Sequence, residues 1–248
     1  MNSCQNRKLK IDIKNVNKSY NEVEVLKNIS INVYEGEIVS ILGPSGCGKS
    51  TIFNIISNLI DYDSGKINID GKLSYMYQKD LLLPHKNIID NVSLPLTLIK
   101  EKSHKNKFLK KKEARKKVEK YFDIFGLTGY ENKYPSELSG GMKQRANFLR
   151  TFVNSNDIML LDEPFGALDS ITKASMQKWL LEVKSKVNST ILLITHDIDE
   201  AINLSDRIYV ISKKPATIKD EFIIDKKYCN DDNLEKIIKL KKDIISLL

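Results

Sequence analysis

The stretch IVSILGPSGCGKS, residues 38–50, joins an apolar run to a glycine-rich turn that ends in Lys49 and Ser50. An apolar run of this length is typical of a buried strand, and the next stretch, KSTIFNIISNLI (residues 49–60), has the spacing of a helix. Strand, glycine turn and helix in this order are the context that a phosphate-binding P-loop requires. The alternative, a glycine-rich loop that arose by chance, does not explain the lysine and the serine. The stretch therefore predicts an α/β protein that binds a nucleotide.

The residue types of this turn suit the chemistry of phosphate. Glycines let backbone N–H groups wrap around phosphate oxygens, and the start of the helix adds positive potential. We expect Lys49 to neutralise the β and γ phosphates and Ser50 to coordinate Mg²⁺. Cys47 is expected only to fill space; the alternative is a thiol whose oxidation inhibits the site. The candidate nucleotide-binding residues here are Gly43, Pro44, Ser45, Gly46, Cys47, Gly48, Lys49, Ser50 and Thr51.

A second candidate strand, DIMLLDEP (residues 157–164), ends in two adjacent carboxylates. Asp162, at the tip of the strand, is well placed to be a partner of Mg²⁺. Glu163 follows it and can polarise the water that attacks a γ-phosphate. Acids at strand ends are common in α/β proteins, so this pattern indicates a nucleotide-hydrolysing site only in combination with the P-loop.

Apolar strands alternate with helical patterns along the rest of the chain, and this predicts a parallel sheet with right-handed crossovers. Residues 8–16, 66–70 and 73–77 are expected strands of the N-terminal third. After residue 143, expected helices at 144–153, 170–187 and 199–205 alternate with strands at 157–164, 189–197 and 206–212. Residues 79–150 contain no comparable strand and are expected to form a mostly helical subdomain. Residues 213–248 are expected to form a short tail of strand and helix.

Bulk composition bounds the class of protein. The chain has 248 residues, 41% hydrophobic and 29% charged, which fits one soluble domain. No apolar run approaches the roughly 20 residues that span a bilayer, and the N-terminus lacks the apolar segment of a signal peptide. We therefore expect a cytoplasmic location. Three scattered cysteines, Cys4, Cys47 and Cys229, favour neither a disulfide framework nor a zinc site.

The positive charge is concentrated in one segment. The whole chain has a net charge of +8, and residues 100–120 alone hold eleven Lys or Arg against three Glu. A nucleic-acid-binding face usually spreads its basic charge more widely, so we expect no nucleic-acid partner. Either a solvated helix surface or a patch near anionic lipid headgroups fits this segment.

A second glycine turn narrows the function. The stretch LSGGMKQR (residues 138–145) is not needed by small-molecule kinases. Regulatory GTPases normally carry Asn-Lys-x-Asp, whereas ENKYP (residues 131–135) lacks the acid. Together with LLDEPFGALD (160–169) and LLITHD (192–197), this turn resembles the nucleotide-binding subunit of an ABC transporter. The resemblance covers residues 9–212 as the core cassette and implies an ABC ATPase. Its expected fold has a parallel-sheet core, an N-terminal antiparallel β subdomain and a helical subdomain.

The resemblance implies that two cassettes face each other head to tail, with ATP between the P-loop of one and the second glycine turn of the other. It places Ser139, Gly140 and Gly141 against the partner's γ-phosphate. The alternative for Ser139 is the role of an ordinary helix N-cap. Other positions follow from the same resemblance: Tyr20 stacks on adenine, Gln78 contacts Mg²⁺, Asp169 contacts the partner cassette, and His196 contacts the γ-phosphate. Core packing is the alternative for Tyr20, and a structural role is the alternative for His196.

The stretches DEPFGALD and LLLPHKNIIDNVSLPL (residues 81–96) resemble bacterial importers of the nitrate, sulfonate and taurine group, which includes pyrimidine and thiamine-precursor importers. This implies a cassette dimer, separate permease subunits, an extracytoplasmic solute-binding protein and a place at the cytoplasmic face of the membrane. The surface of residues 78–91 is expected to receive a permease helix. Met76-Tyr77, Pro84-His85 and the lysine-rich segment depart from the group's usual pattern, and these departures weaken any inference about the solute.

Two alternatives stay open. An ATPase for export or lipoprotein release more often carries Asp-Glu-Pro-Thr-Gly-Asn-Leu-Asp where this chain has DEPFGALD. A soluble ABC protein that acts on ribosomes or DNA usually has two cassettes or a long coiled-coil insertion, and this chain has neither pattern.

Overall fold

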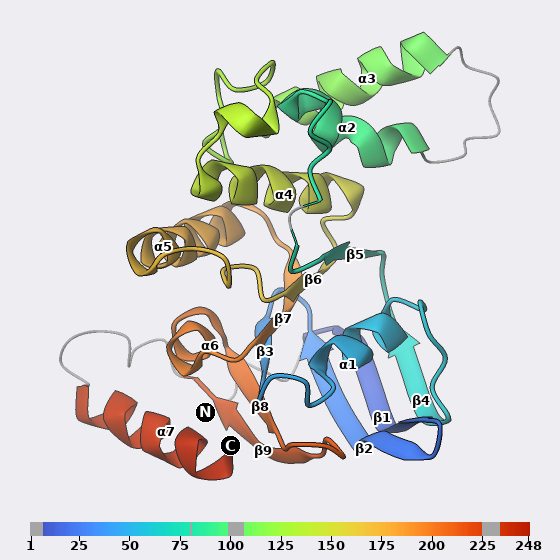
Figure 1. Ribbon diagram of the computed structural model, residues 1–248, viewed down its shortest axis with the longest axis vertical. Helices are drawn as coiled ribbons and strands as arrows, with labels where there is room; N and C mark the ends of the chain where they lie inside the picture. Colours follow the sequence, from blue (N-terminus) through green and yellow to red (C-terminus); the bar gives the residue numbers. More distant parts are fainter. Residues whose placement is uncertain (1–6, 80, 99–106, 225–233) are drawn as a thin grey trace.

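The computed structural model describes residues 7–79, 81–98, 107–224 and 234–248. Two sheets and a group of helices make up this part of the chain (Figure 1). No helix within these ranges combines the length and apolar character needed to cross a membrane. Cys4, Cys229 and residues 100–106 of the lysine-rich segment lie outside the described residues.

The larger sheet has six strands in the order β5-β6-β7-β3-β8-β9. Its first five strands are parallel, and β9 pairs antiparallel with β8 at the edge, so the core sheet is mixed rather than wholly parallel. Every residue of β3, β6 and β7 is buried, which explains why these strands are continuous apolar runs. The strands are β3 (Ile38–Leu42), β5 (Leu73–Met76), β6 (Ile158–Asp162), β7 (Thr190–Thr195), β8 (Arg207–Ile211) and β9 (Ile218–Ile223).

The smaller sheet is antiparallel, with the order β2-β1-β4. Its strands are β1 (Leu9–Tyr20), β2 (Val23–Tyr34) and β4 (Ser64–Ile69). Asn21 and Glu22, between β1 and β2, have φ values of 45° and 68°. Two successive left-handed residues make the kind of two-residue turn that matches the twist of a hairpin. The sequence analysis did not identify β2, because polar residues interrupt its alternation.

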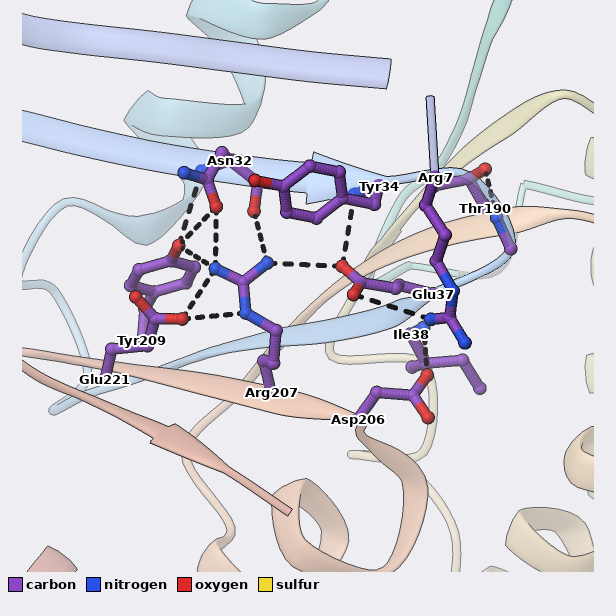
Figure 2. Close-up of polar contacts among 11 residues, drawn as sticks. Arg7, Asn32, Tyr34, Glu37, Ile38, Thr190, Asp206, Arg207, Tyr209 and Glu221 are labelled. Carbon is purple, nitrogen blue, oxygen red and sulfur yellow. Dashed lines mark hydrogen bonds and ion pairs between the residues drawn. The ribbon is translucent and has the colours of Figure 1, made fainter. Parts of the chain in front are cut away.

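A buried cation ties the two sheets together. Figure 2 shows Arg207 of β8 between Asn32 of β2, Glu37 and Glu221 of β9. Its guanidinium donates to Oδ1 of Asn32 at 2.6 Å, to Oε2 of Glu37 at 3.2 Å and to Oε1 of Glu221 at 2.7 Å. The Arg207 side chain is only 11% exposed. Because a buried guanidinium needs such partners, this network fixes the antiparallel sheet against the core sheet.

Some helices pack against the core sheet, and others form a group at one end of the molecule (Figure 1). Figure 1 places α2, α3 and α4 together at the end of the molecule opposite the antiparallel sheet, within the expected helical subdomain. Phe125, Phe148, Phe152 and Trp179 form aromatic contacts that join this helical part to α5. The helices are α1 (Lys49–Ile56), α2 (Ile88–Leu98), α3 (Lys107–Glu119), the 3₁₀ turn η1 (Pro135–Glu137), α4 (Gly140–Asn154), α5 (Ser170–Lys186), α6 (Ile198–Leu204) and α7 (Leu234–Leu247).

The expected permease-facing surface needs one correction. The sequence predicts that Asn91 lies on it, but this residue is fully buried. Its Nδ2 donates to the carbonyl oxygens of Leu83, Lys86 and Asn87, and its Oδ1 accepts from the backbone N–H of Leu83 at 2.6 Å. Asn91 therefore shapes the loop from inside, since an amide can satisfy several backbone groups at once.

Candidate active site

The glycine turn lies between β3 and α1 at the carboxyl end of the core sheet. Gly46 and Gly48 have φ values of +74° and +128°, in the region that L side chains rarely adopt. A Cβ added at Gly48 would also lie 2.9 Å from Cδ2 of Leu26. Glycine at these positions lets the backbone curl before the helix begins, as a phosphate cradle needs.

Lys49 is held inside this turn. Its Nζ donates to the carbonyl oxygens of Gly43 at 2.7 Å and Pro44 at 2.8 Å, and the residue is only 5% exposed. Backbone carbonyls hold the ammonium in place without cancelling its charge. A charged donor held at the floor of a backbone cradle is suited to an anionic ligand.

Asp162 lies at the end of β6 and is buried. Burial raises the pKa of its carboxyl, and a hydrogen bond from the Ser50 hydroxyl opposes that rise. The Tyr75 hydroxyl also donates to Oδ2 of Asp162, at 3.1 Å. The described residues contain no group of three or more His, Cys, Asp or Glu that could hold a metal by itself. One hydroxyl and one carboxylate beside a phosphate cradle fit Mg²⁺, which binds through few protein ligands together with substrate phosphates.

Glu163 follows β6 and contacts residues from the segments that follow β5 and β7. Its Oε2 accepts from Nε2 of Gln78 at 2.9 Å, and its Oε1 lies 3.1 Å from Nδ1 of His196. Its backbone N–H donates to the carbonyl oxygen of Ile194 of β7 at 2.9 Å, and its φ is 45°. A non-glycine residue in the left-handed region costs on the order of 1–3 kcal/mol and persists only where the surroundings hold it. This carboxylate is thus held in position between an amide and an imidazole.

A pocket of about 320 Å³ adjoins the P-loop, Gln78 and Glu163, whereas Asp162 and His196 are not among its lining residues. Its lining residues are Ser45, Gly46, Gly48, Lys49, Ser50, Thr51, Gln78, Glu163 and Lys214. Gly43, Pro44 and Cys47 belong to the turn but do not line the pocket, and Cys47 is buried with a thiol pKa raised by that burial. Burial suppresses the reactive thiolate, which supports the space-filling reading of Cys47.

Lys214 also lines this pocket, although no sequence motif predicted it. This lysine follows β8, near the carboxyl end of the core sheet where the P-loop also lies. Ligands bind at that end in open α/β sheets, so a basic residue within three positions of the end of a core strand was a usable signal.

Tyr20 lies outside this pocket. It ends β1, is 45% exposed and lies under the ammonium of Lys18, 5.3 Å from the ring centre. The core-packing alternative for Tyr20 is therefore wrong. An exposed aromatic ring at a strand end remains available to a ligand.

The second glycine turn lines a different pocket, of about 640 Å³, between α4 and α5. Ser139 N-caps α4 by accepting from the backbone N–H of Met142 at 3.3 Å. Ser139 and Gly140 are exposed, while a Cβ at Gly141 would lie 3.3 Å from Cγ2 of Thr172. Asp169 also lines this pocket and N-caps α5. Among the described residues that line them, the two pockets have none in common.

Comparison with known proteins gives the family. Residues 26–166 match the sequence model of a protein family described as ABC transporter. The formylaminopyrimidine import ATP-binding protein ThiZ of Halalkalibacterium halodurans is 49% identical over 193 residues, covering 77% of this chain and 74% of that protein. The aliphatic sulfonates import ATP-binding protein SsuB of Bacillus cereus is 37% identical over 233 residues, covering 90% of this chain and 88% of that protein.

Solved structures agree with the fold. The dimeric ABC transporter cassette MJ0796 has a TM-score of 0.71 and 32% identity, covering 87% of this chain and 99% of that chain. A second dimeric structure of MJ0796 represents a post-hydrolysis state with ADP and phosphate bound, at a TM-score of 0.68 and 31% identity.

Proposed function

Since this chain belongs to the ABC transporter family and is an ATP-hydrolysing cassette of that family, we propose that two copies form a head-to-tail dimer that drives solute import. Its permease subunits are separate chains, and an extracytoplasmic protein delivers the solute. ThiZ and SsuB, whose names give formylaminopyrimidine and aliphatic sulfonates, suggest a small polar solute of one of these kinds.

The separation of the two glycine turns carries this proposal. The P-loop pocket holds Lys49 and Glu163, whereas Ser139 and Gly140 lie at another pocket of the same chain. A helix start such as that of α4 offers unpaired N–H groups and positive potential. Gly140 is exposed at this start. A second copy can therefore present its α4 start to the phosphates held by the first copy's P-loop.

The predicted site residues have distinct roles in the proposed reaction. Lys49 and the backbone of residues 43–51 bind the phosphates, while Ser50, Gln78 and Asp162 would hold Mg²⁺. The ion would supply neutralisation of phosphate charge. Glu163 takes a proton from the attacking water, and His196 orders that water and contacts the γ-phosphate. Tyr20 stacks on the adenine, and Asp169 contacts the second cassette.

Uptake by a reconstituted transporter tests the proposal. The chain is assembled in vesicles with its permease, and ATP hydrolysis and uptake are measured with a formylaminopyrimidine and with an aliphatic sulfonate, each with its solute-binding protein. We expect one of them to enter and to stimulate hydrolysis. Hydrolysis accompanied by outward movement of a lipid or lipoprotein would assign the chain to export, and hydrolysis by a chain that binds no permease would exclude a transport role.

A further inference from the structure

A lysine on α5 links the start of that helix to the start of α6. Nζ of Lys173 lies 2.6 Å from Oδ2 of Asp197 and 3.0 Å from Oε2 of Glu200. The Lys173 side chain is 20% exposed, and that of Glu200 is 2% exposed. A buried carboxylate left without its cation is costly, so this contact is held firmly.

Lys173 lies between two aspartates that cap helices, Asp169 at the start of α5 and Asp197 at the start of α6. Asp169 caps α5 by accepting from the backbone N–H of Thr172 at 3.0 Å, and the N–H of Lys173 donates to the Asp169 carbonyl at 2.8 Å. Asp197 caps α6 by accepting from the backbone N–H of Glu200 at 3.0 Å. Lys173 therefore connects the first turn of one helix to the cap of the other, and these contacts fix the direction in which each helix begins.

The two caps adjoin different parts of the proposed machinery. Asp169 lines the pocket of the second glycine turn, where the other cassette is expected. Asp197 directly follows His196, whose Nδ1 lies 3.1 Å from the Glu163 carboxylate. Through the Lys173 ammonium, a displacement of the start of α5 would reach Asp197, the residue next to His196.

We propose that Lys173 is a positioning residue that transmits contact with the second cassette from Asp169 to His196. The inference rests on the proposed function, because it takes Asp169 as the contact with the other cassette and His196 as the residue at the γ-phosphate. Lys173 touches neither the nucleotide nor the water. It sets the orientation of His196 once the dimer closes, and its effect falls on the rate of hydrolysis rather than on nucleotide binding.

Steady-state hydrolysis by the full chain assembled with its permease tests this role. Lys173→Met removes the charge at similar length, and we expect kcat to fall about 10- to 100-fold, the loss typical of supporting partners around a site. The KM for ATP and the affinity for ADP stay within about threefold of wild type, because Lys173 does not contact the nucleotide in the ground state. Lys173→Arg restores most of kcat. Lys178→Met, on the exposed side of the same helix, is the matched control.

A double-mutant cycle separates positioning from simple stabilisation. Asp197→Ser keeps a capping oxygen but removes the partner charge. If Lys173 acts through Asp197, the double variant Lys173→Met with Asp197→Ser loses no more kcat than the worse single variant. Should Lys173→Met fail to fold, Lys173→Arg and Asp197→Ser carry the comparison, with Asp197→Ser expected to lose kcat and Lys173→Arg to keep it.

Three results would overturn the role of Lys173: full kcat in Lys173→Met, additive losses in the cycle, or full kcat in Asp197→Ser. A lower melting temperature with unchanged kcat would reduce the link to a structural one. Absence of hydrolysis in the wild-type assembly is a different outcome, since it would remove the proposed function itself.

Discussion

Nδ1 of His196 lies 3.1 Å from Oε1 of Glu163, while Nε2 of Gln78 lies 2.9 Å from Oε2 of the same carboxylate. Both oxygens of Glu163 are thus engaged by side chains from separate segments. A carboxylate that is held on both sides cannot rotate freely. Its orientation toward the attacking water is therefore fixed before that water binds.

Glu163→Gln keeps the shape of this side chain and removes its basicity. We expect the hydrolysis rate to fall by about 10²–10⁴, the usual contribution of a positioned general base. ATP binding survives, because Lys49 and the backbone cradle are intact, and ATP-bound dimers accumulate. Rapid-quench kinetics and size-exclusion chromatography measure the two effects, with Glu235→Gln on the exposed side of α7 as the control. A near-wild-type rate in Glu163→Gln would remove this residue from the role of base.

Lys214 gives a prediction that no motif supplied. Because it lines the P-loop pocket from the segment after β8, its ammonium is expected to contact the bound nucleotide. Because the Lys214 charge is exposed, Lys214→Met should weaken ATP binding by only about two- to fivefold, with kcat unchanged. Titration with a fluorescent ATP analogue measures the change, and Lys213→Met, an exposed neighbour outside the pocket, is the control. Equal affinities in the two variants would contradict the contact.

The sequence predicted those parts of the site in which local order determines geometry. The P-loop needs only a strand, glycines and a helix start, all of which are contiguous in residues 38–50. Asp162 and Glu163 were predictable because the carboxyl ends of parallel strands meet at one edge. Gln78 and His196, which flank the Glu163 carboxylate, come from segments distant from it in the sequence, and only the family resemblance predicted that the three belong to one site.

Other features could not be derived from the sequence because they depend on tertiary packing. Asn91 looks like a polar surface residue, yet it is buried because four backbone contacts satisfy its amide. Arg207 looks like an ordinary charge at a strand start, but it joins the two sheets through residues that are 170 and 175 positions away. Lys173 has the spacing of a surface lysine, and its role depends on where α6 lies.

Acidification should loosen the contact between α2 and α3. Burial alone would raise the pKa of Asp90, but hydrogen bonds from Lys111 and Arg115, at 2.8 Å and 2.7 Å, lower it below its usual value. A carboxyl whose folded pKa is lowered stabilises the fold above its unfolded pKa of about 3.9, and this stability is lost as the pH falls through the lowered value.

We therefore expect Asp90→Asn to cost about 1–3 kcal/mol at pH 7 and much less at an acidic pH below the lowered pKa of Asp90. Urea unfolding at both pH values, followed by circular dichroism, gives the two free energies. Asp123→Asn changes an exposed acid in the same part of the fold and serves as control. An equal cost of Asp90→Asn at both pH values would show that the ion pairs do not stabilise this contact.

The permease-facing loop provides a crosslinking prediction. The Leu83 side chain is partly buried, whereas Leu81 and Tyr77 are 46% and 42% exposed. Exposed apolar groups beside Gln78 are suited to a partner surface. A cysteine at Leu81 should crosslink to a permease helix in assembled membranes. A cysteine at Ile223, which is 79% exposed on β9, should not. Crosslinks to the permease from Ile223 and none from Leu81 would move the docking site away from this loop.

The last prediction separates a site within one chain from a site between two chains. Lys49→Ala removes the charge held in the P-loop. Gly140→Asp places a carboxylate at the exposed start of α4, where like charge repels a γ-phosphate. A Cβ at Gly140 meets only Cδ2 of Leu168, at 3.6 Å, so this substitution fits without strain. Each variant alone has two defective sites in a head-to-tail dimer and should be inactive.

A mixed dimer of these two variants has one site with both turns intact and one with both defects. Mixing them in the presence of the permease should therefore restore part of the ATPase activity, up to about one quarter of the wild-type rate if pairing is random and sites fire independently. Co-purification of two differently tagged copies first establishes that mixed dimers form. If mixed dimers are present and activity stays absent, either each ATP is held within a single chain or hydrolysis needs both sites intact. A dimer linked in tandem, with Lys49→Ala in one half only, distinguishes these two cases. Activity near half of wild type in that dimer, with none in the mixed dimer, would place each site within one chain and contradict the two-chain site.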